Sequence, residues 1–245
     1  METGRNELKM YRGKDMGDRE KLINTCLEIL SRGNPNELYD ILPHISLVRS
    51  PAFMEALVQL LHSGDRDQKE FAALGLGSLG KPNCIEDLLE VFMRPETFKG
   101  TGSQSLQTAI IIALGEIGDE AAVQPLIRIY DLSFPQDQFS LRRKRLVLSS
   151  LGTLAQQGSV KAEQELLRLM KHKHEEVRAQ AVTELATAYW HRAGDIPDEL
   201  LQQICGLTEE SSEEVRKAAL SSLSNLADLG CESAEEFLKT VNSEK

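Results

Sequence analysis

Apolar residues recur along most of this chain at spacings of three and four positions, which places their side chains on one stripe of a helix. The clearest such stripes span residues 85–92, 123–130, 166–170, 200–204 and 237–241. No stretch alternates apolar and polar residues for long, and the β-branched residues are scattered. Strands are therefore not expected, and the pattern predicts an all-α protein.

A leucine followed by a small residue recurs at nearly constant intervals before these stripes. The recurring leucines are Leu76, Leu114, Leu151, Leu185 and Leu223. Their spacings of 38, 37, 34 and 38 residues define a repeating unit of two helices, A and then B. A pair of this size cannot bury its apolar stripe alone, so neighbouring pairs must stack into one continuous core.

The expected fold is a right-handed α-solenoid, a superhelix of about six helix pairs that occupies residues 35–245. Residues 1–34 are expected to form an N-terminal segment with a capping helix, which is amphipathic from about residue 19 to 30. Small residues in the A helices, such as Gly77 and Ala113, would let neighbouring backbones approach closely. Acidic turns precede several A helices, and their carboxylates interact favourably with the positive end of the helix dipole.

The pattern Val-Arg-x-x-Ala-x-x-x-Leu, followed by a small residue, a turn and a short B helix, resembles HEAT repeats. It is most similar to the short type named after phycobilisome lyases. Its clearest copies are residues 177–185, 215–223 and 113–126, and the resemblance extends from about residue 35 to the end. It implies about six HEAT-like helix pairs. The resemblance specifies the fold better than the function, because this repeat serves lyases, hydroxylases, glycosylases and adaptors.

Composition narrows the classes of partner. The chain has 28 Lys and Arg against 38 Asp and Glu, and the net charge of −10 makes general nucleic-acid binding unexpected. The longest purely apolar run, residues 109–114, is far shorter than the roughly 20 residues of a membrane-spanning helix. Four isolated cysteines without a CxxC pair favour free thiols in a reducing compartment, so a cytoplasmic location is expected.

No motif in the sequence indicates catalysis or a resident cofactor. Residues 75–80 match GxGxxG, but two of these glycines fall in columns of the repeat, so they are interpreted as packing residues. The segment 172–175 reads His-Lys-His-Glu and offers a single His-Glu dyad. The HEAT-type hydroxylases that the chain resembles hold iron with several such dyads. A solvated helix start is the preferred interpretation, and no metal site is expected.

The candidate partner-binding residues are charged and aromatic positions on the B helices and on two long connections. B helices are expected to line the concave face of the solenoid, and the connections are residues 93–104 and 131–140. The densest cation cluster, residues 142–145, follows the second connection. The selected residues are Arg128, Arg168, Arg142, Arg145, Phe134, Phe139, Glu86 and Glu90.

Two functional hypotheses follow. The first is a non-catalytic scaffold or adaptor that binds a protein partner through the concave face and the long inter-repeat loops. The second, implied by the resemblance, is an E/F-type phycobilin lyase subunit or a phycobilisome-degradation factor acting on phycobiliproteins. In the second case a bilin would be a transferred ligand rather than a cofactor. The first hypothesis requires no nucleic acid, membrane or small molecule, and the sequence leaves enzymatic activity open.

Overall fold

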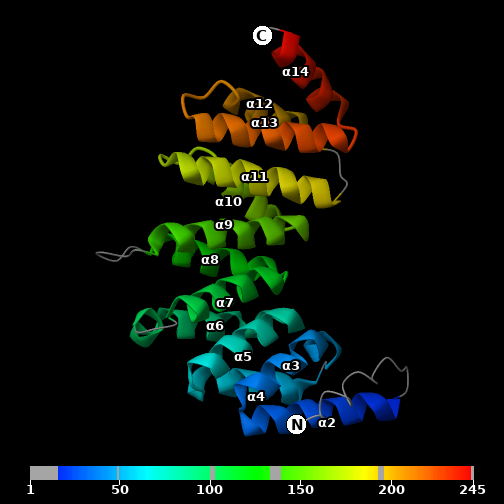
Figure 1. Cartoon of the computed structure of the whole chain (residues 1–245), viewed down its shortest axis with the longest axis vertical. Helices are drawn as coiled ribbons and strands as arrows, with labels where there is room; N and C mark the ends of the chain where they lie inside the picture. The colour runs from blue at the N-terminus through cyan, green and yellow to red at the C-terminus, as the bar shows by residue number, and fades with distance from the viewer. Residues whose placement is uncertain (1–15, 49, 100–102, 133–138, 193–195, 244–245) are drawn as a thin grey trace. The chain divides into compact units, whose positions relative to one another are not determined.

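The computed structural model describes residues 16–48, 50–99, 103–132, 139–192 and 196–243 (Figure 1). These residues form α-helices and short 3-10 helices and contain no strand, so the expected all-α solenoid class is confirmed. The chain forms two compact units, Met1–Ile117 (unit 1) and Gly118–Lys245 (unit 2). The division expected at residue 34, between a capping segment and the repeats, stays a prediction.

Unit 1 is built from helices that pack in alternation. Its α-helices are α2 (Met16–Arg32), α3 (Pro35–Ile41), α4 (Pro51–Ser63), α5 (Arg66–Leu79), α6 (Ile85–Met93) and α7 (Ser103–Glu116). Its 3-10 helices are η1 (Leu42–Leu47), η2 (Pro82–Cys84) and η3 (Pro95–Phe98). The A helices α5 and α7 pack directly on each other, α4 packs on α5, and α6 packs on both α4 and α7. Helix α2 packs on α3 and α4.

Unit 2 repeats this arrangement. Its elements are η4 (Glu120–Ala122), α8 (Val123–Asp131), α9 (Ser140–Gln156), α10 (Val160–Leu169), α11 (Glu175–Arg192), α12 (Asp198–Leu207), α13 (Glu213–Asp228) and α14 (Glu232–Ser243). Figure 1 shows the A helices α9, α11 and α13 in succession, and each packs on the next. Helix α10 packs on α9 and α11, whereas α12 and α14 both pack on α13.

Local sequence explains where several helices begin and end. Asp65 accepts a hydrogen bond from the Gln68 backbone N–H at 2.9 Å, and the Gln68 side chain accepts the Asp65 N–H in return, which forms a capping box at the start of α5. Ser159 and Ser212 cap α10 and α13 in the same position. Gly80 ends α5 with φ of 61°, a left-handed conformation that glycine adopts without strain.

The recurring leucines lie in the core of the stacked A helices. Leu76, Leu114, Leu151, Leu185 and Leu223 are all fully buried. The small residues beside them permit the close stacking that the sequence predicts. A Cβ on Gly77 would lie 2.7 Å from the Ala113 Cα, so the two helices cross at this glycine. Gly77 and Gly80 of the GxGxxG segment therefore serve packing and helix termination.

Candidate functional site

The residues selected from the sequence divide between the two units. Glu86 and Glu90 lie exposed on α6 in unit 1. The arginines lie exposed in unit 2, and they are Arg128 on α8, Arg142 and Arg145 on α9 and Arg168 on α10. Phe139 is half-buried directly before α9, whereas Phe134 lies outside the described residues. The structure places these residues on named elements, and their role in binding stays a prediction.

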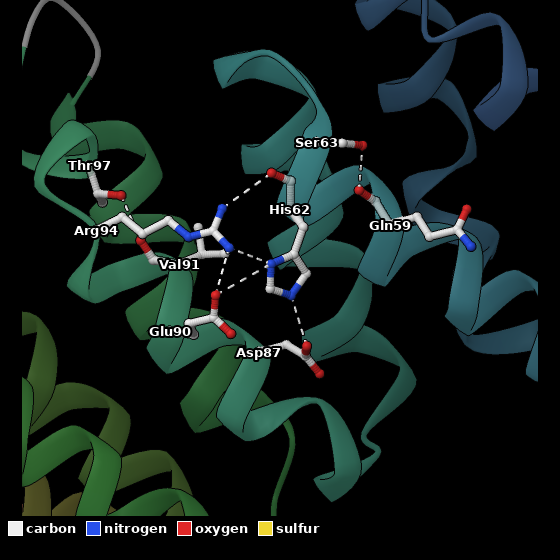
Figure 2. Close-up of polar contacts among 8 residues, drawn as sticks. All are labelled: Gln59, His62, Ser63, Asp87, Glu90, Val91, Arg94 and Thr97. Atoms are coloured by element: carbon white, nitrogen blue, oxygen red, sulfur yellow. Dashed lines mark hydrogen bonds and ion pairs between the residues drawn. The ribbon is translucent and has the colours of Figure 1, made fainter.

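Unit 1 carries a polar cluster between α4 and α6, shown in Figure 2, which consists of His62, Asp87, Glu90 and Arg94 (the His62 cluster). Arg94 Nη2 lies 2.7 Å from His62 Nδ1 and donates to Glu90 Oε1 at 2.7 Å. Arg94 Nη1 also donates to the His62 carbonyl oxygen at 3.3 Å. A guanidinium has only donors, so His62 Nδ1 accepts, and Nε2–H donates to Asp87 Oδ1 at 2.8 Å.

The hydrogen bonds and ion pairs of the His62 cluster connect α4 with α6. The hydrogen bond from Arg94, and then the positive charge of Arg94, lower the pKa of the Glu90 carboxyl. Beside the cluster, Thr97 Oγ1 donates to the Val91 carbonyl at 2.7 Å, and both groups are buried. Arg94 therefore secures the end of α6 against α4. The sequence pattern selects Glu90 as a partner-binding residue, and this structural contact is not apparent from it.

In unit 2, the connection between α10 and α11 is held by a partly buried ion pair. Arg178 donates from Nε and Nη2 to the two carboxylate oxygens of Glu210 at 2.8 and 2.6 Å. Its Nη1 donates to the carbonyl oxygens of His172 and Lys173 at 2.8 and 3.2 Å. The His174 N–H donates to His172 Nδ1 at 3.1 Å. These bonds fix the backbone that carries Lys171 and Lys173.

An open groove of about 700 Å³ lies beside this connection and is bounded by α10 and α12. We call it the cationic groove. Its lining residues are Leu167, Arg168, Lys171, His172, Lys173 and Gln203. Arg168 Nε donates to Glu165 at 2.7 Å. Lys171 and Lys173 are exposed, and within the described part of the chain neither forms an ion pair with a carboxylate. The groove therefore combines three cations with the apolar side chain of Leu167 and the amide of Gln203.

A further cation approaches the cationic groove from α9. Lys144 Nζ lies 5.2 Å from the centroid of the buried Tyr130 ring, and that ring meets His172 edge-on at 6.1 Å. Burial is the main cause that lowers the pKa of His172, and the charges of His174, Lys144, Lys173 and Arg168 lower it further. His172 is therefore neutral at pH 7 and adds an N–H donor without a charge.

Arg168 is among the partner-binding residues predicted from the sequence, whereas Lys171 and Lys173, which line the same groove, and the nearby Lys144 are not. The segment 172–175 was interpreted only as a solvated helix start. The available signal was the run of basic residues that follows Arg168 at the end of a B helix. In the cluster at 142–145, Arg143 is buried and its Nη2 donates to the Leu132 carbonyl at 3.0 Å, so this arginine stabilises the start of α9.

The remaining chemical candidates contribute little to this site. Over the described residues, no group of three or more His, Cys, Asp and Glu could hold a metal ion. Burial raises the pKa of Cys26 and of Cys84 to about 11, so both thiols stay protonated at neutral pH. None of the helices in the described part is long and apolar enough to cross a membrane.

Helix pairs that stack through small residues of their A helices define a helical repeat protein. Residues 106–131, which cover most of α7 and all of α8, match the family model described as PBS lyase HEAT-like repeat. The chain carries a HEAT-like repeat of this type, and the resemblance seen in the sequence is confirmed.

Two crystal structures of engineered proteins from the Northeast Structural Genomics Consortium are similar to this chain. The first is 17% identical with a TM-score of 0.45, and the match covers 92% of this chain and 64% of that one. The chain therefore spans 64% of the length of this first structure. The second is 16% identical with a TM-score of 0.38, covering 94% of this chain and 98% of that one. No curated protein matches the sequence.

Proposed function

We propose that this chain is a non-catalytic HEAT-like scaffold that binds a protein partner through the B-helix face of unit 2. The observation that carries the proposal is the cationic groove, where Arg168, Lys171 and Lys173 surround an open, partly apolar surface. These cations stand out in a chain with a net charge of −10. Charge complementarity in a pre-formed groove favours a partner with an acidic segment.

The state of the reactive groups supports a non-catalytic role. His62 is occupied by Asp87 and Arg94, so it is not available as a general base. Cys26 and Cys84 are buried and protonated, which makes them poor nucleophiles. A cytoplasmic location and the absence of a resident cofactor remain predictions that accompany this proposal.

The test is capture of partners from native lysate, followed by mass spectrometry, with the paired variant Arg128→Glu and Arg168→Glu. Recovery of the partner should fall more than tenfold while the circular dichroism spectrum stays unchanged, because both arginines are exposed. The control is Lys217→Glu with Lys239→Glu, which changes the net charge equally at exposed sites outside the groove. Undiminished capture by the Arg128 and Arg168 variant would refute the assignment.

A second candidate is an E/F-type phycobilin lyase subunit or a phycobilisome-degradation factor. The family match at residues 106–131 favours it, since the matched repeat is named after such lyases. The cations of the groove could pair with the propionate groups of an open-chain tetrapyrrole. Mixing the protein with bilin, with and without a phycobiliprotein, should then shift the absorption spectrum of the bilin. An unchanged spectrum in both mixtures contradicts this candidate.

A further inference from the structure

The cationic groove of unit 2 concentrates more positive charge than its own acids balance. Three cations line it, Arg168, Lys171 and Lys173, and no carboxylate is among its lining residues. Glu165 accepts a hydrogen bond from Arg168, whereas the charges of Glu175 and Glu176, at the start of α11, act on Arg178. Within the described residues Lys171 and Lys173 form no ion pair, so the lining itself holds about two positive charges that no lining carboxylate balances, and a bound anion would relieve their repulsion.

The size of that excess distinguishes between possible anions. A single Asp or Glu side chain brings one negative charge. A phosphate monoester carries about −1.5 to −2 at pH 7 and has three strong acceptor oxygens. One phosphate group therefore offsets the positive charge that no lining carboxylate balances. Arg168 and the two lysines supply the hydrogen-bond donors.

The backbone that carries His172 and Lys173 is held in place before any ligand arrives. Arg178 fixes the carbonyls of His172 and Lys173, and Glu210 fixes Arg178. His172 Nδ1 accepts the His174 N–H, so the proton of the neutral ring is on Nε2 and can be donated to an anion. A rigid connection reduces the entropy that binding would otherwise cost.

We infer that the cationic groove recognises a phosphorylated Ser or Thr side chain on the protein partner. This inference rests on the proposed scaffold function and names the chemistry of the bound segment. Arg168, Lys171 and Lys173 contact the phosphate, His172 adds a neutral donor, and Leu167 and Gln203 contact the flanking residues. Lys144 contributes charge from the face of the Tyr130 ring.

The direct test uses three fluorescent peptides of otherwise neutral sequence that differ at one position, which is phosphoserine, Ser or Glu. Fluorescence anisotropy with the full chain should show that the phosphoserine peptide binds at least tenfold more tightly than either of the others. Lys171→Gln with Lys173→Gln should remove that preference. Lys217→Gln with Lys239→Gln, which removes the same charge from exposed positions elsewhere in unit 2, should change affinity less than twofold.

A second readout reports on the groove itself. The imidazole of His172 can be followed by NMR as pH is varied, and the phosphoserine peptide should raise the pKa of His172, because a nearby anion stabilises the imidazolium. Equal affinity for the phosphoserine and Ser peptides, or no change at His172, would overturn the inference.

Tight binding of the Glu peptide would also overturn the phosphate assignment, since the groove would then accept any acidic side chain. The inference and the scaffold proposal can fail separately. Partner capture that depends on Arg168 without a preference for phosphoserine refutes only the inference. Phosphoserine binding without any captured protein refutes only the scaffold.

Discussion

His62, in the last turn of α4, and His172, three residues after the end of α10, both lie near the C-terminal end of a B helix, but their electrostatic surroundings are opposite. In unit 1, His62 is bound by Asp87 and Arg94, and Arg94 is in turn neutralised by Glu90. In unit 2, burial and then the charges of the surrounding cations lower the pKa of His172. The repeat fixes where these side chains lie, whereas the neighbouring positions decide whether their charges are used inside the fold or left for a partner.

The stacked A helices show a related contrast. In unit 1, a Cβ on Gly77 would meet the backbone of Ala113 at 2.7 Å. In unit 2, a Cβ on Gly152 would meet the Glu184 side chain, with the nearest carboxylate oxygen at 2.5 Å. The carboxylate can rotate away, and the Glu184 Cβ, at 3.0 Å, must shift by only a few tenths of an ångström, whereas the helix backbone at Ala113 must move as a whole. The same glycine column therefore tolerates substitution differently in the two units.

The largest effect is expected for Gly77→Ala. The added methyl group forces α5 and α7 apart, and the loss from overpacking, typically about 1–3 kcal/mol, exceeds the gain in helix propensity of about 1 kcal/mol. Urea unfolding should show a loss of about 1–2 kcal/mol for Gly77→Ala and a smaller loss, below about 1 kcal/mol, for Gly152→Ala. Gly206→Ala is the control, because no atom lies within 4 Å of its Cβ position, and it should stabilise the protein. Equal losses at Gly77 and Gly152 would contradict the contrast between the units.

Arg94→Ala tests the structural use of charge in unit 1. The substitution removes hydrogen bonds to the His62 ring, the His62 carbonyl and Glu90. The free energy of unfolding should fall by about 1–2 kcal/mol, with no change in phosphopeptide affinity. Lys171→Ala in unit 2 should lower the free energy of unfolding by less than about 0.5 kcal/mol but weaken the binding of the phosphopeptide. Chemical denaturation and anisotropy on the same two variants check both statements.

The repeat and its core could be predicted from the sequence because they depend on local periodicity. The five aligned leucines are buried. Asp65 and Ser212 cap α5 and α13, whose starts the acidic turns predict. The boundary between Ile117 and Gly118 gave no such signal, since the repeat spacing continues across it.

The charge clusters could not be predicted, because they join residues far apart in sequence. His62 and Asp87 are 25 positions apart, and Lys144 reaches the surroundings of His172 only because α9 packs on α8 and α10. Arg143 and Arg142 look alike in the sequence, yet one is buried and the other exposed. Which of two adjacent arginines remains available to a partner depends on the packing of α9, and periodicity alone does not specify it.

A smaller effect is expected for Glu184 and Glu210 of unit 2, whose contributions to stability depend on pH in opposite directions. Burial raises the pKa of Glu184 above that of the unfolded chain, so its contribution to stability falls as pH rises through the interval between the two values. Arg178 lowers the pKa of Glu210, whose contribution is present above the unfolded value and is lost as pH falls through the folded value. At pH 7, Glu184→Gln should raise the melting temperature by a few °C and Glu210→Gln should lower it. Melting curves between pH 4 and 8 check the signs, and a shared sign would refute the assignment.

The smallest effect is expected for Tyr130→Phe, which asks what the aromatic ring beneath Lys144 contributes. The Tyr130 hydroxyl is buried, and within the described part of the chain it has no hydrogen-bond partner, so its desolvation is not compensated. Removing the hydroxyl should leave stability unchanged or raise it by up to about 1 kcal/mol, while the ring still supports Lys144 and contacts His172. Phosphopeptide affinity should change less than twofold. A tenfold loss in the anisotropy assay would mean that the hydroxyl itself reaches the ligand, and the groove would then extend beneath His172 to α8.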